Sequence, residues 1–249
     1  MVLATGNVLP IAYALAYLIG TSGPVVAENG GLILHRGRVT RVSDPRAALR
    51  AHAAVQRRYP AARLFTDRWR VTEVAYPELP GTLAGVRRAL ADAGAASTVR
   101  VERTGFAVHL MDPHHSKFEG VRRALALIGV APADALAVGD SDNDRSMIVG
   151  CGVGVAVGDA SEGLKQGADF VARGRGGAGL WEAFARYGVA APPRAGATGA
   201  ARGARGRPTR GWRRPSGRAP RPPRRAPARA ARRAPPARPA ARRRRTRRS

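Results

Sequence analysis

Apolar and polar residues follow two periods along residues 1–190, one typical of strands and the other of helices. Helical spacing predicts helices over residues 8–18, 118–128 and 179–187. Short apolar runs predict buried strands at 1–4, 24–27, 135–138, 154–156 and 170–171. Because helices and strands alternate in this way, the pattern favours an α/β core built on a parallel sheet.

A different pattern interrupts this core between residues 44 and 113. Helical spacing recurs at 47–58 and 82–93, and β-type alternation occurs at 70–75, 98–102 and 107–111. We interpret the segment as an αββαββ insertion that forms a small sheet with helices on one face. The predicted division of the chain is a core at 1–43, a cap at 44–113, more core at 114–190 and a tail at 191–249.

The composition of the last 59 residues differs from that of the rest of the chain. Of these, 53 are Ala, Arg, Pro or Gly, and 21 are Arg, with no Lys, Asp or Glu. Such a segment buries too little apolar surface to offset its conformational entropy, so we predict that the tail is disordered. Residues 1–190 carry 22 basic and 17 acidic residues, a balance of +5 out of a total of +26. The basicity therefore belongs mainly to the tail.

The basic tail has more than one interpretation. Its charges would attract nucleic-acid phosphates without sequence preference, although Trp212 is its only aromatic residue and base stacking is not supported. Ala, Arg, Pro and Gly are also the residues of GC-only codons, so a GC-rich gene read in a shifted frame would give the same text. A genuine disordered extension is the third interpretation.

Cysteine usage and hydropathy restrict the class of protein. Cys151 is the only cysteine, which excludes an internal disulfide and a Cys-rich zinc site. The apolar run from residue 8 to residue 19 contains Pro10 and is shorter than the roughly 20 residues of a membrane-spanning helix. We therefore expect a cytoplasmic protein without a membrane partner, and the sequence does not predict its oligomeric state.

Three aspartates stand at alternate positions in the sequence GDSDND, directly after the predicted strand 135–138. Ligands bind at the carboxyl ends of strands in parallel α/β sheets, so a site is expected here. Asp140 and Asp144 are spaced so that both can face one Mg²⁺ ion, which typically takes one or two carboxylates together with a substrate phosphate. The alternative is a helix cap, since Asp and Ser favour helix N-termini, but the crowding of carboxylates favours the metal.

Two further segments are compatible with phosphate binding. Thr5-Gly6-Asn7 follows the first predicted strand and offers a hydroxyl and amide groups at a helix start, although the same turn is an ordinary helix cap. Lys117 opens a predicted helix, where the helix dipole disfavours a cation, so a phosphate or carboxylate partner is one interpretation and a solvated lysine the other.

Two other patterns do not support a site. The glycines within residues 150–158 do not fit G-x-G-x-x-G at a helix start after a strand, and a tightly packed strand is favoured over a dinucleotide site. His114 and His115 are neighbours whose side chains diverge in regular structure, and we interpret them as part of a loop.

Five segments in order resemble the archaeal phosphoglycolate phosphatases of the haloacid dehalogenase superfamily: VLATGNVLP, GPVVAENGG, TDRWR, VHLMD followed by SK, and VGDSDND. The resemblance covers about residues 1–190 and not the tail. It implies a Rossmann-like parallel-sheet core with a mobile cap. It also implies Mg²⁺-dependent hydrolysis of a small phosphate monoester, phosphoglycolate, through an aspartyl-phosphate. A sugar-phosphate phosphatase of the same superfamily is the alternative.

The resemblance implies substrate-binding roles by position. Thr5 would hydrogen-bond the transferring phosphoryl group within a turn that includes Asn7, and Lys117 would bridge the nucleophile and the phosphate. Arg68 and Arg70, on either side of a tryptophan, could hold the substrate carboxylate by charge-assisted hydrogen bonds. Pairing of these two arginines with nearby acids is the alternative.

The resemblance also implies a metal site and reveals a departure from the family. Asp140 and Asp144 would ligate Mg²⁺, and Asn143 would support their loop. The family's first motif, an apolar strand ending in D-x-D-G, supplies the nucleophile and the acid/base aspartate, and no D-x-D-G occurs in this sequence. It is expected about 30 residues upstream of Thr5, the length of a strand and a helix. We therefore predict an N-terminally truncated phosphatase that is inactive by itself.

Overall fold

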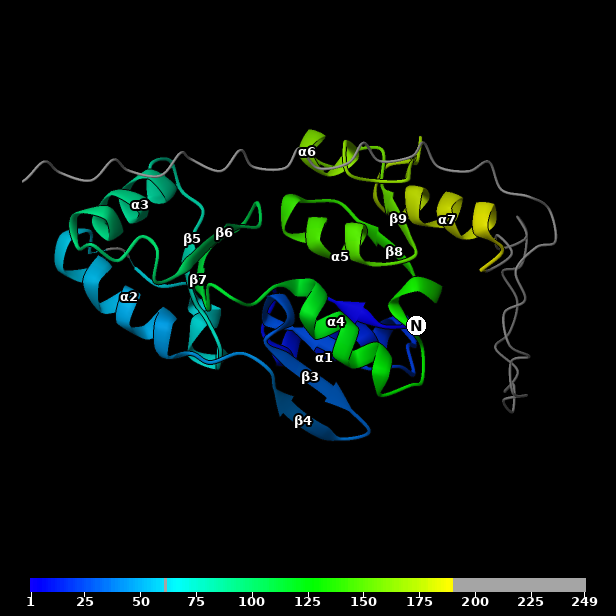
Figure 1. The fold of residues 1–249 in the computed structure, drawn as a ribbon, viewed down its shortest axis with the longest axis horizontal. Coiled ribbons are helices and arrows are strands. Elements are labelled where there is room, and N and C mark those ends of the chain that lie inside the picture. Colours follow the sequence, from blue (N-terminus) through cyan, green and yellow to red (C-terminus); the bar gives the residue numbers. More distant parts are fainter. Residues whose placement is uncertain (61, 190–249) are drawn as a thin grey trace, which may run out of the picture. The chain divides into compact units, whose positions relative to one another are not determined.

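The computed structural model describes residues 1–60 and 62–189, so the predicted tail lies outside the described residues. Strands of the core form two separate sheets (Figure 1). One sheet contains, in spatial order, β1 (Leu3–Ala4), β2 (Val25–Ala27), β3 (Leu32–His35) and β4 (Arg38–Arg41). The other contains β10 (Phe170–Val171), β9 (Val153–Ala156) and β8 (Leu136–Gly139). The expected α/β core with parallel strands is confirmed.

Pairing in the two core sheets is parallel except at the β3–β4 hairpin and its junction with β2. The hairpin turns at Arg36 and Gly37, whose φ angles of 49° and 74° suit the two-residue turn that matches strand twist. β1 and β8 are the end strands of their sheets, and a pocket lies between the residues that follow them. The parallel strands of the core therefore belong to two sheets.

Helices connect and cover the core strands. They are α1 (Leu9–Ile19), α4 (Lys117–Ala126), α5 (Arg145–Gly150), α6 (Glu162–Lys165) and α7 (Gly176–Tyr187). Pro10 stands in the first turn of α1 and Gly20 ends it with φ 78°, which are the positions that suit these two residues. α4 packs on β2 and β3 and also on α5, so one apolar cluster joins both core sheets.

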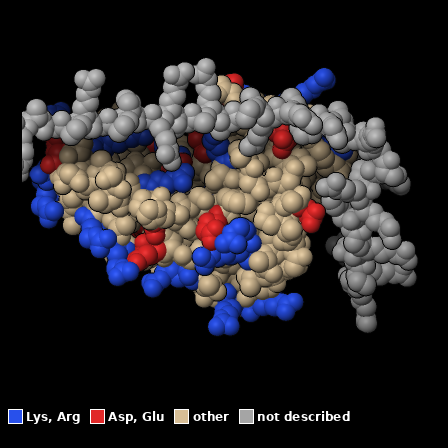
Figure 2. Space-filling model, in the orientation of Figure 1, with Lys and Arg blue, Asp and Glu red and all other residues tan. Residues whose placement is uncertain are grey.

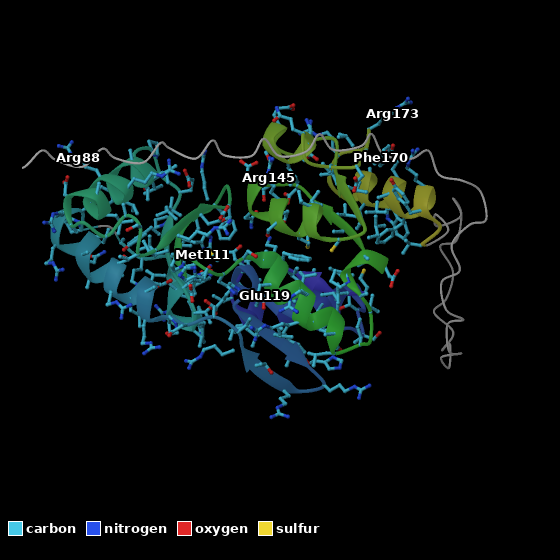
Figure 3. All side chains as sticks on the ribbon, viewed as in Figure 1. Arg88, Met111, Glu119, Arg145, Phe170 and Arg173 are labelled. Carbon is cyan, nitrogen blue, oxygen red and sulfur yellow. The ribbon has the colours of Figure 1, made fainter. Side chains whose placement is uncertain are left out.

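The inserted segment folds into a small sheet of β5 (Val74–Pro77), β7 (Ala107–Met111) and β6 (Arg100–Arg103), in that order and antiparallel. α2 (Arg46–Arg58) and α3 (Thr82–Asp92) pack against each other and against this sheet, as predicted. Figure 3 places Met111, the buried last residue of β7, where the small sheet meets the core.

The order of elements in the insertion is αβαββ, which corrects the expected αββαββ. Between α2 and β5 the described chain forms a 3-10 turn, η2 (Phe65–Trp69), closed by the Asp67 carboxylate, which accepts from the Ala75 N–H at 2.7 Å. The strand predicted at 70–75 begins only at Val74. The N–H groups of Val71 and Thr72 donate to the Glu28 carboxylate of the core and so are not available to a sheet.

Charged side chains of both signs share the face drawn in Figure 2, where Lys and Arg stand along the rim with Asp and Glu between them. This distribution agrees with the small balance of +5 over residues 1–190. In the part of the chain that the structure describes, every helix is too short or too polar to cross a membrane.

Candidate active site

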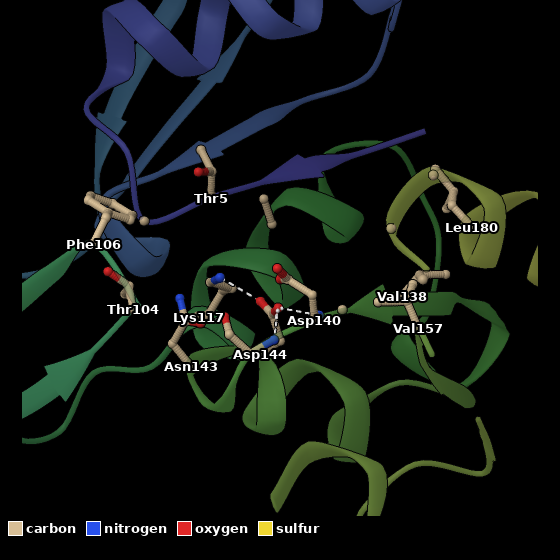
Figure 4. A pocket seen from close by; sticks show the side chains of 16 residues that line it. Thr5, Thr104, Phe106, Lys117, Val138, Asp140, Asn143, Asp144, Val157 and Leu180 are labelled. Carbon is tan, nitrogen blue, oxygen red and sulfur yellow. Dashed lines mark hydrogen bonds and ion pairs between the residues drawn. The ribbon is translucent and has the colours of Figure 1, made fainter. Parts of the chain in front are cut away.

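A pocket of about 420 Å³ lies where β1 and β8 end (Figure 4), within the size range typical of small-ligand sites. The charged residues among those that line it are Lys117, Asp140 and Asp144. Its complete lining consists of Ala4, Thr5, Gly6, Thr104, Phe106, Lys117, Val138, Gly139, Asp140, Ser141, Asn143, Asp144, Val157, Gly176, Gly177 and Leu180. The pocket therefore brings together residues from both core sheets and from the β6–β7 hairpin.

Lys117 and Asp144 form a buried ion pair in this pocket. Lys117 is the first residue of α4, and its Nζ lies 2.5 Å from Asp144 Oδ1. The other carboxylate oxygen, Asp144 Oδ2, accepts from the backbone N–H groups of Asp140 at 3.1 Å and Ser141 at 3.4 Å. A buried charge pair is tolerated only when it is well hydrogen-bonded, and here the loop after β8 provides those bonds.

The loop after β8 can approach Asp144 this closely because residue 139 is glycine. A Cβ atom added to Gly139 would lie 2.6 Å from Asp144 Cβ. Asp144 closes the 3-10 turn η4 (Asp142–Asp144), in which Ser141 and Asp144 form a reciprocal capping box. The helix cap that the sequence left open as an alternative is therefore present, and its carboxylate also faces the pocket.

The Asp140 carboxyl lies where the nearby negative charge of Asp144 is only partly offset by Lys117. Burial, then the nearby Asp144 charge, raises the pKa of Asp140, and Lys117 offsets only part of this effect. Two carboxylates against one ammonium leave one uncompensated negative charge at the pocket. Within residues 1–60 and 62–189, no cluster of three or more His, Cys, Asp or Glu residues is placed to hold a metal. Two carboxylates fit Mg²⁺, which keeps several waters and uses substrate oxygens as ligands.

Thr5 occupies the corresponding position after β1. Its N–H continues the strand by donating to Val26 O at 2.9 Å, and its hydroxyl accepts from the Asn7 N–H at 3.1 Å. The Asn7 side chain folds back on the same hydroxyl, with Nδ2 at 3.4 Å from Thr5 Oγ1. Thr5 and Gly6 line the pocket in the turn that precedes α1, whereas Asn7 does not line it.

A buried hydrogen-bonded network connects this pocket with the small sheet. Asn143 Nδ2 donates to Asn29 Oδ1 at 3.0 Å, and Asn29 Nδ2 donates to Glu73 Oε2 at 3.0 Å. Glu73 in turn binds Arg70 and His109. Asn29 belongs to the 3-10 turn η1 (Glu28–Gly30), which places its amide between Asn143 in the loop after β8 and Glu73 in the insertion. Asn143 therefore joins the loop after β8 to the insertion.

The two arginines predicted to hold a substrate carboxylate lie outside the lining of the pocket. The Arg70 guanidinium is buried, pairs with Glu73, lies 3.6 Å from Asp67 and donates to Gly6 O at 3.0 Å. Arg68 is stacked over the rings of Phe65 at 4.5 Å and Trp69 at 5.4 Å. Arg70 therefore pairs with nearby acids, which is the alternative interpretation that the sequence left open.

Thr104 and Phe106 line the pocket and were not found by sequence reasoning. They belong to the turn between β6 and β7, where Gly105 has φ 78°. The glycine between two β-type runs predicts a hairpin, but nothing in the local sequence indicates that its tip faces residues of the core. The contact of β6 with η4 brings the hairpin to the pocket.

Comparison with known sequences gives a consistent set of relatives. The sequence pattern of the haloacid dehalogenase-like hydrolase family matches residues 82–184. The chain is 37% identical over 188 residues to the phosphoglycolate phosphatase of Methanothermobacter thermautotrophicus, covering 75% of this chain and 82% of that protein. It is 34% identical to the phosphoglycolate phosphatase of Methanopyrus kandleri, over 72% of this chain and 78% of that one.

The fold also resembles solved structures. A crystal structure of a Thermoplasma acidophilum protein superimposes with a TM-score of 0.66 and 24% identity, covering 76% of this chain and 83% of that chain. This structural likeness concerns the fold alone. The evidence for the family comes from the sequence relatives described above.

Proposed function

The chain belongs to the archaeal-type phosphoglycolate phosphatases of the haloacid dehalogenase-like hydrolases, and from this we propose that its pocket is the 2-phosphoglycolate and Mg²⁺ site of an enzyme that hydrolyses this ester to glycolate and phosphate. Membership of the family makes the protein a phosphatase by descent. The observation that carries the proposal is the buried Lys117–Asp144 pair beside Asp140 and Thr5 at the ends of two core strands.

In this proposal the phosphoryl group of the substrate lies between Thr5 and Lys117. The Thr5 hydroxyl and the Gly6 N–H donate to phosphoryl oxygens, and the Lys117 ammonium offsets their negative charge. Asp140 and Asp144 hold Mg²⁺, and Asn143 keeps their loop in place through Asn29. When bound, Mg²⁺ would neutralise charge that develops on the phosphoryl oxygens.

We also propose that this chain alone does not hydrolyse the substrate. Phosphatases of this superfamily act through an aspartyl-phosphate, which requires a carboxylate nucleophile that is free to attack. Among the described residues, the carboxylates that line the pocket are Asp140 and Asp144, and both oxygens of Asp144 already accept hydrogen bonds. These two are the proposed metal ligands, and the nucleophile motif D-x-D-G does not occur in the sequence. The chain would then supply the phosphate-binding and metal-binding groups only.

Ligand-induced stabilisation and turnover test these two statements separately. The thermal midpoint of the 249-residue chain is measured with Mg²⁺, with 2-phosphoglycolate, and with both, alongside phosphate release from 2-phosphoglycolate. We expect the midpoint to rise most with both ligands, because a ligand that binds only the folded state stabilises it. Phosphate release should remain at background.

Matched substitutions connect these results to the site. Asp140→Asn and Thr5→Ala should lose the midpoint rise, whereas Asp92→Asn, an exposed change at the end of α3, should keep it. A wild-type chain that gains no stability from Mg²⁺ with 2-phosphoglycolate would refute the proposed site. Robust phosphate release that Asp140→Ala abolishes would refute the statement that the chain is inactive alone.

A further inference from the structure

Arg70 of the insertion donates to the backbone of the turn that follows β1. Its Nη1 atom lies 3.0 Å from the carbonyl oxygen of Gly6, 64 positions earlier in the sequence. Gly6 lines the pocket, whereas the Arg70 side chain is 0% exposed and is not part of the lining. Arg70 therefore does not contact a ligand in the pocket, but it holds a peptide group at the pocket wall.

The Gly6 carbonyl and the Asn7 N–H belong to that one peptide group. In a trans peptide they point to opposite edges of the same plane, and the described residues contain no cis peptide bond. Arg70 holds the carbonyl edge, and at the other edge the Asn7 N–H donates to Thr5 Oγ1 at 3.1 Å. A rotation of this peptide away from Arg70 would therefore also turn the N–H away from Thr5.

The hydrogen bonds of Thr5 leave its hydroxyl hydrogen available to a ligand. Thr5 Oγ1 accepts from the Asn7 N–H and, at 3.4 Å, from Asn7 Nδ2, which occupies the two acceptor positions of a hydroxyl oxygen. Among residues 1–60 and 62–189, the Thr5 hydroxyl donates to no acceptor. Figure 4 shows Thr5 on the opposite wall of the pocket from the Lys117–Asp144 pair. An acceptor in the pocket is therefore the remaining partner of its hydrogen.

Two buried acids keep Arg70 in this position. Nη1 also pairs with Glu73 Oε1, and Nε lies 3.6 Å from Asp67 Oδ1, with both carboxylate side chains 1% exposed. The second oxygen of Glu73 accepts from Asn29 Nδ2 at 3.0 Å. The guanidinium is thus fixed from the side of the insertion, and its contact with Gly6 fixes the turn after β1 relative to the insertion.

We propose that Arg70 is a positioning residue for phosphate binding, which acts through the peptide group between residues 6 and 7 to orient the Thr5 hydroxyl toward a phosphoryl oxygen. The inference rests on the proposed function, in which Thr5 binds the phosphoryl group. It gives Arg70 a role at the phosphate end of the substrate instead of the expected contact with the substrate carboxylate. Packing of the insertion on the core thereby becomes part of the phosphate site.

Affinity for 2-phosphoglycolate, measured by calorimetry with Mg²⁺ on the full 249-residue chain, tests the inference without requiring turnover. Thr5→Val should lower this affinity roughly 10-fold, the usual effect of one hydrogen bond to a charged group. Arg70→Met/Glu73→Gln removes the guanidinium and neutralises its main partner, which limits the loss of stability. Its affinity should fall toward that of Thr5→Val.

Combining these substitutions separates positioning from a general loosening of the fold. Because Arg70 acts through the Thr5 hydroxyl, adding Thr5→Val to the double variant should change its affinity little further. Independent effects would instead multiply to a loss of roughly 100-fold, and that result would overturn the inference.

Arg63→Met is the matched control, because Arg63 pairs with the buried Asp67 of the same segment and lies outside the lining of the pocket. It should lower the thermal midpoint and leave the affinity unchanged, and an affinity loss equal to that of the Arg70 variants would overturn the inference.

Arg70→Lys keeps a buried cation beside Glu73, so it should fold even where the double variant does not. A lysine ammonium ends one bond short of the Nη1 position and leaves Gly6 O without its donor, so we expect weaker binding here too. Wild-type affinity in Arg70→Lys or in the double variant overturns the inference and leaves the proposed function standing. A wild-type chain that does not bind 2-phosphoglycolate overturns both.

Discussion

The side-chain amide of Asn143 donates to Asn29 Oδ1 at 3.0 Å, across 114 positions of the sequence. Both residues are buried, and the Asn29 amide in turn donates to Glu73 of the insertion. Hydrogen bonds through Asn29 therefore join the loop after β8 to the small sheet. A buried network of this kind is stabilising only while every member is satisfied, which makes Asn29 a sensitive position.

Substitutions of Asn29 should separate the side-chain contribution from the backbone contribution. Asn29 has φ 51°, a left-handed conformation that Asn tolerates and Ala disfavours. Asn29→Gly removes two hydrogen bonds from buried partners, and we expect it to lower the free energy of unfolding by roughly 2 kcal/mol. Asn29→Ala should cost about 1 kcal/mol more, because it adds backbone strain. Urea unfolding measures both variants, and an equal or smaller loss in Asn29→Ala would show that φ does not matter here.

Removal of Lys117 should leave the Asp144 charge buried without its partner. We expect Lys117→Met to lower the free energy of unfolding by about 3 kcal/mol, and the Lys117→Met/Asp144→Asn double variant to recover part of this loss, because the buried charge of Asp144 is removed together with its partner. The matched control is Lys165→Met, whose partner Glu162 is 80% exposed and whose change should cost less than about 1 kcal/mol. Equal losses in the two single variants, measured by urea unfolding, would contradict the importance of burial.

Most helices and strands were predictable because their local pattern is also their packing pattern. The apolar residues spaced along 47–58 form the buried face of α2. The run at 107–111 forms β7, which is buried at every position. The strand predicted from residue 70 was wrong at its start, because the Val71 and Thr72 N–H groups have a better acceptor in Glu28, 43 and 44 positions away. A local pattern does not contain that information.

The candidate site was predictable only in part for the same reason. Thr5, Lys117, Asp140 and Asp144 stand at the ends of predicted elements, and a parallel α/β topology brings such ends together. The positions of the Arg68, Arg70 and Thr104 side chains depend instead on how the insertion packs against the core. The cation–aromatic contacts of Arg68 and the contact between Thr104 and His109 join residues that no periodicity relates.

Glu28 should give the protein a measurable dependence of stability on pH. Its buried carboxylate accepts from Val71 and Thr72, and burial, followed by the charge of Glu73, raises its pKa above the usual 4.5. Since the folded pKa exceeds the unfolded one, the contribution of Glu28 is fully present below the unfolded pKa and is lost as pH rises through the folded pKa.

The comparison variant for Glu28 is Glu28→Gln, which keeps an acceptor oxygen and does not titrate. The free energy of unfolding of the wild-type chain relative to this variant should fall between pH 4.5 and pH 7. Urea unfolding of both proteins at the two pH values provides the measurement. A difference that stays constant or rises with pH would mean that burial does not raise the pKa of Glu28.

Cys151, the only thiol of the chain, should react slowly in the folded protein. Burial raises the pKa of Cys151 from 9.0 to about 11, and the thiolate is the reactive form, so alkylation by iodoacetamide at pH 8 should be roughly 100-fold slower than in the urea-unfolded chain. Because the folded pKa is the higher one, the thiol contributes stability that is lost as pH rises between these two values. Mass spectrometry gives both rates, and each signal comes from one residue because the sequence has no second cysteine. Rates within about 10-fold of each other would show that the thiol is more accessible to water than its packing implies.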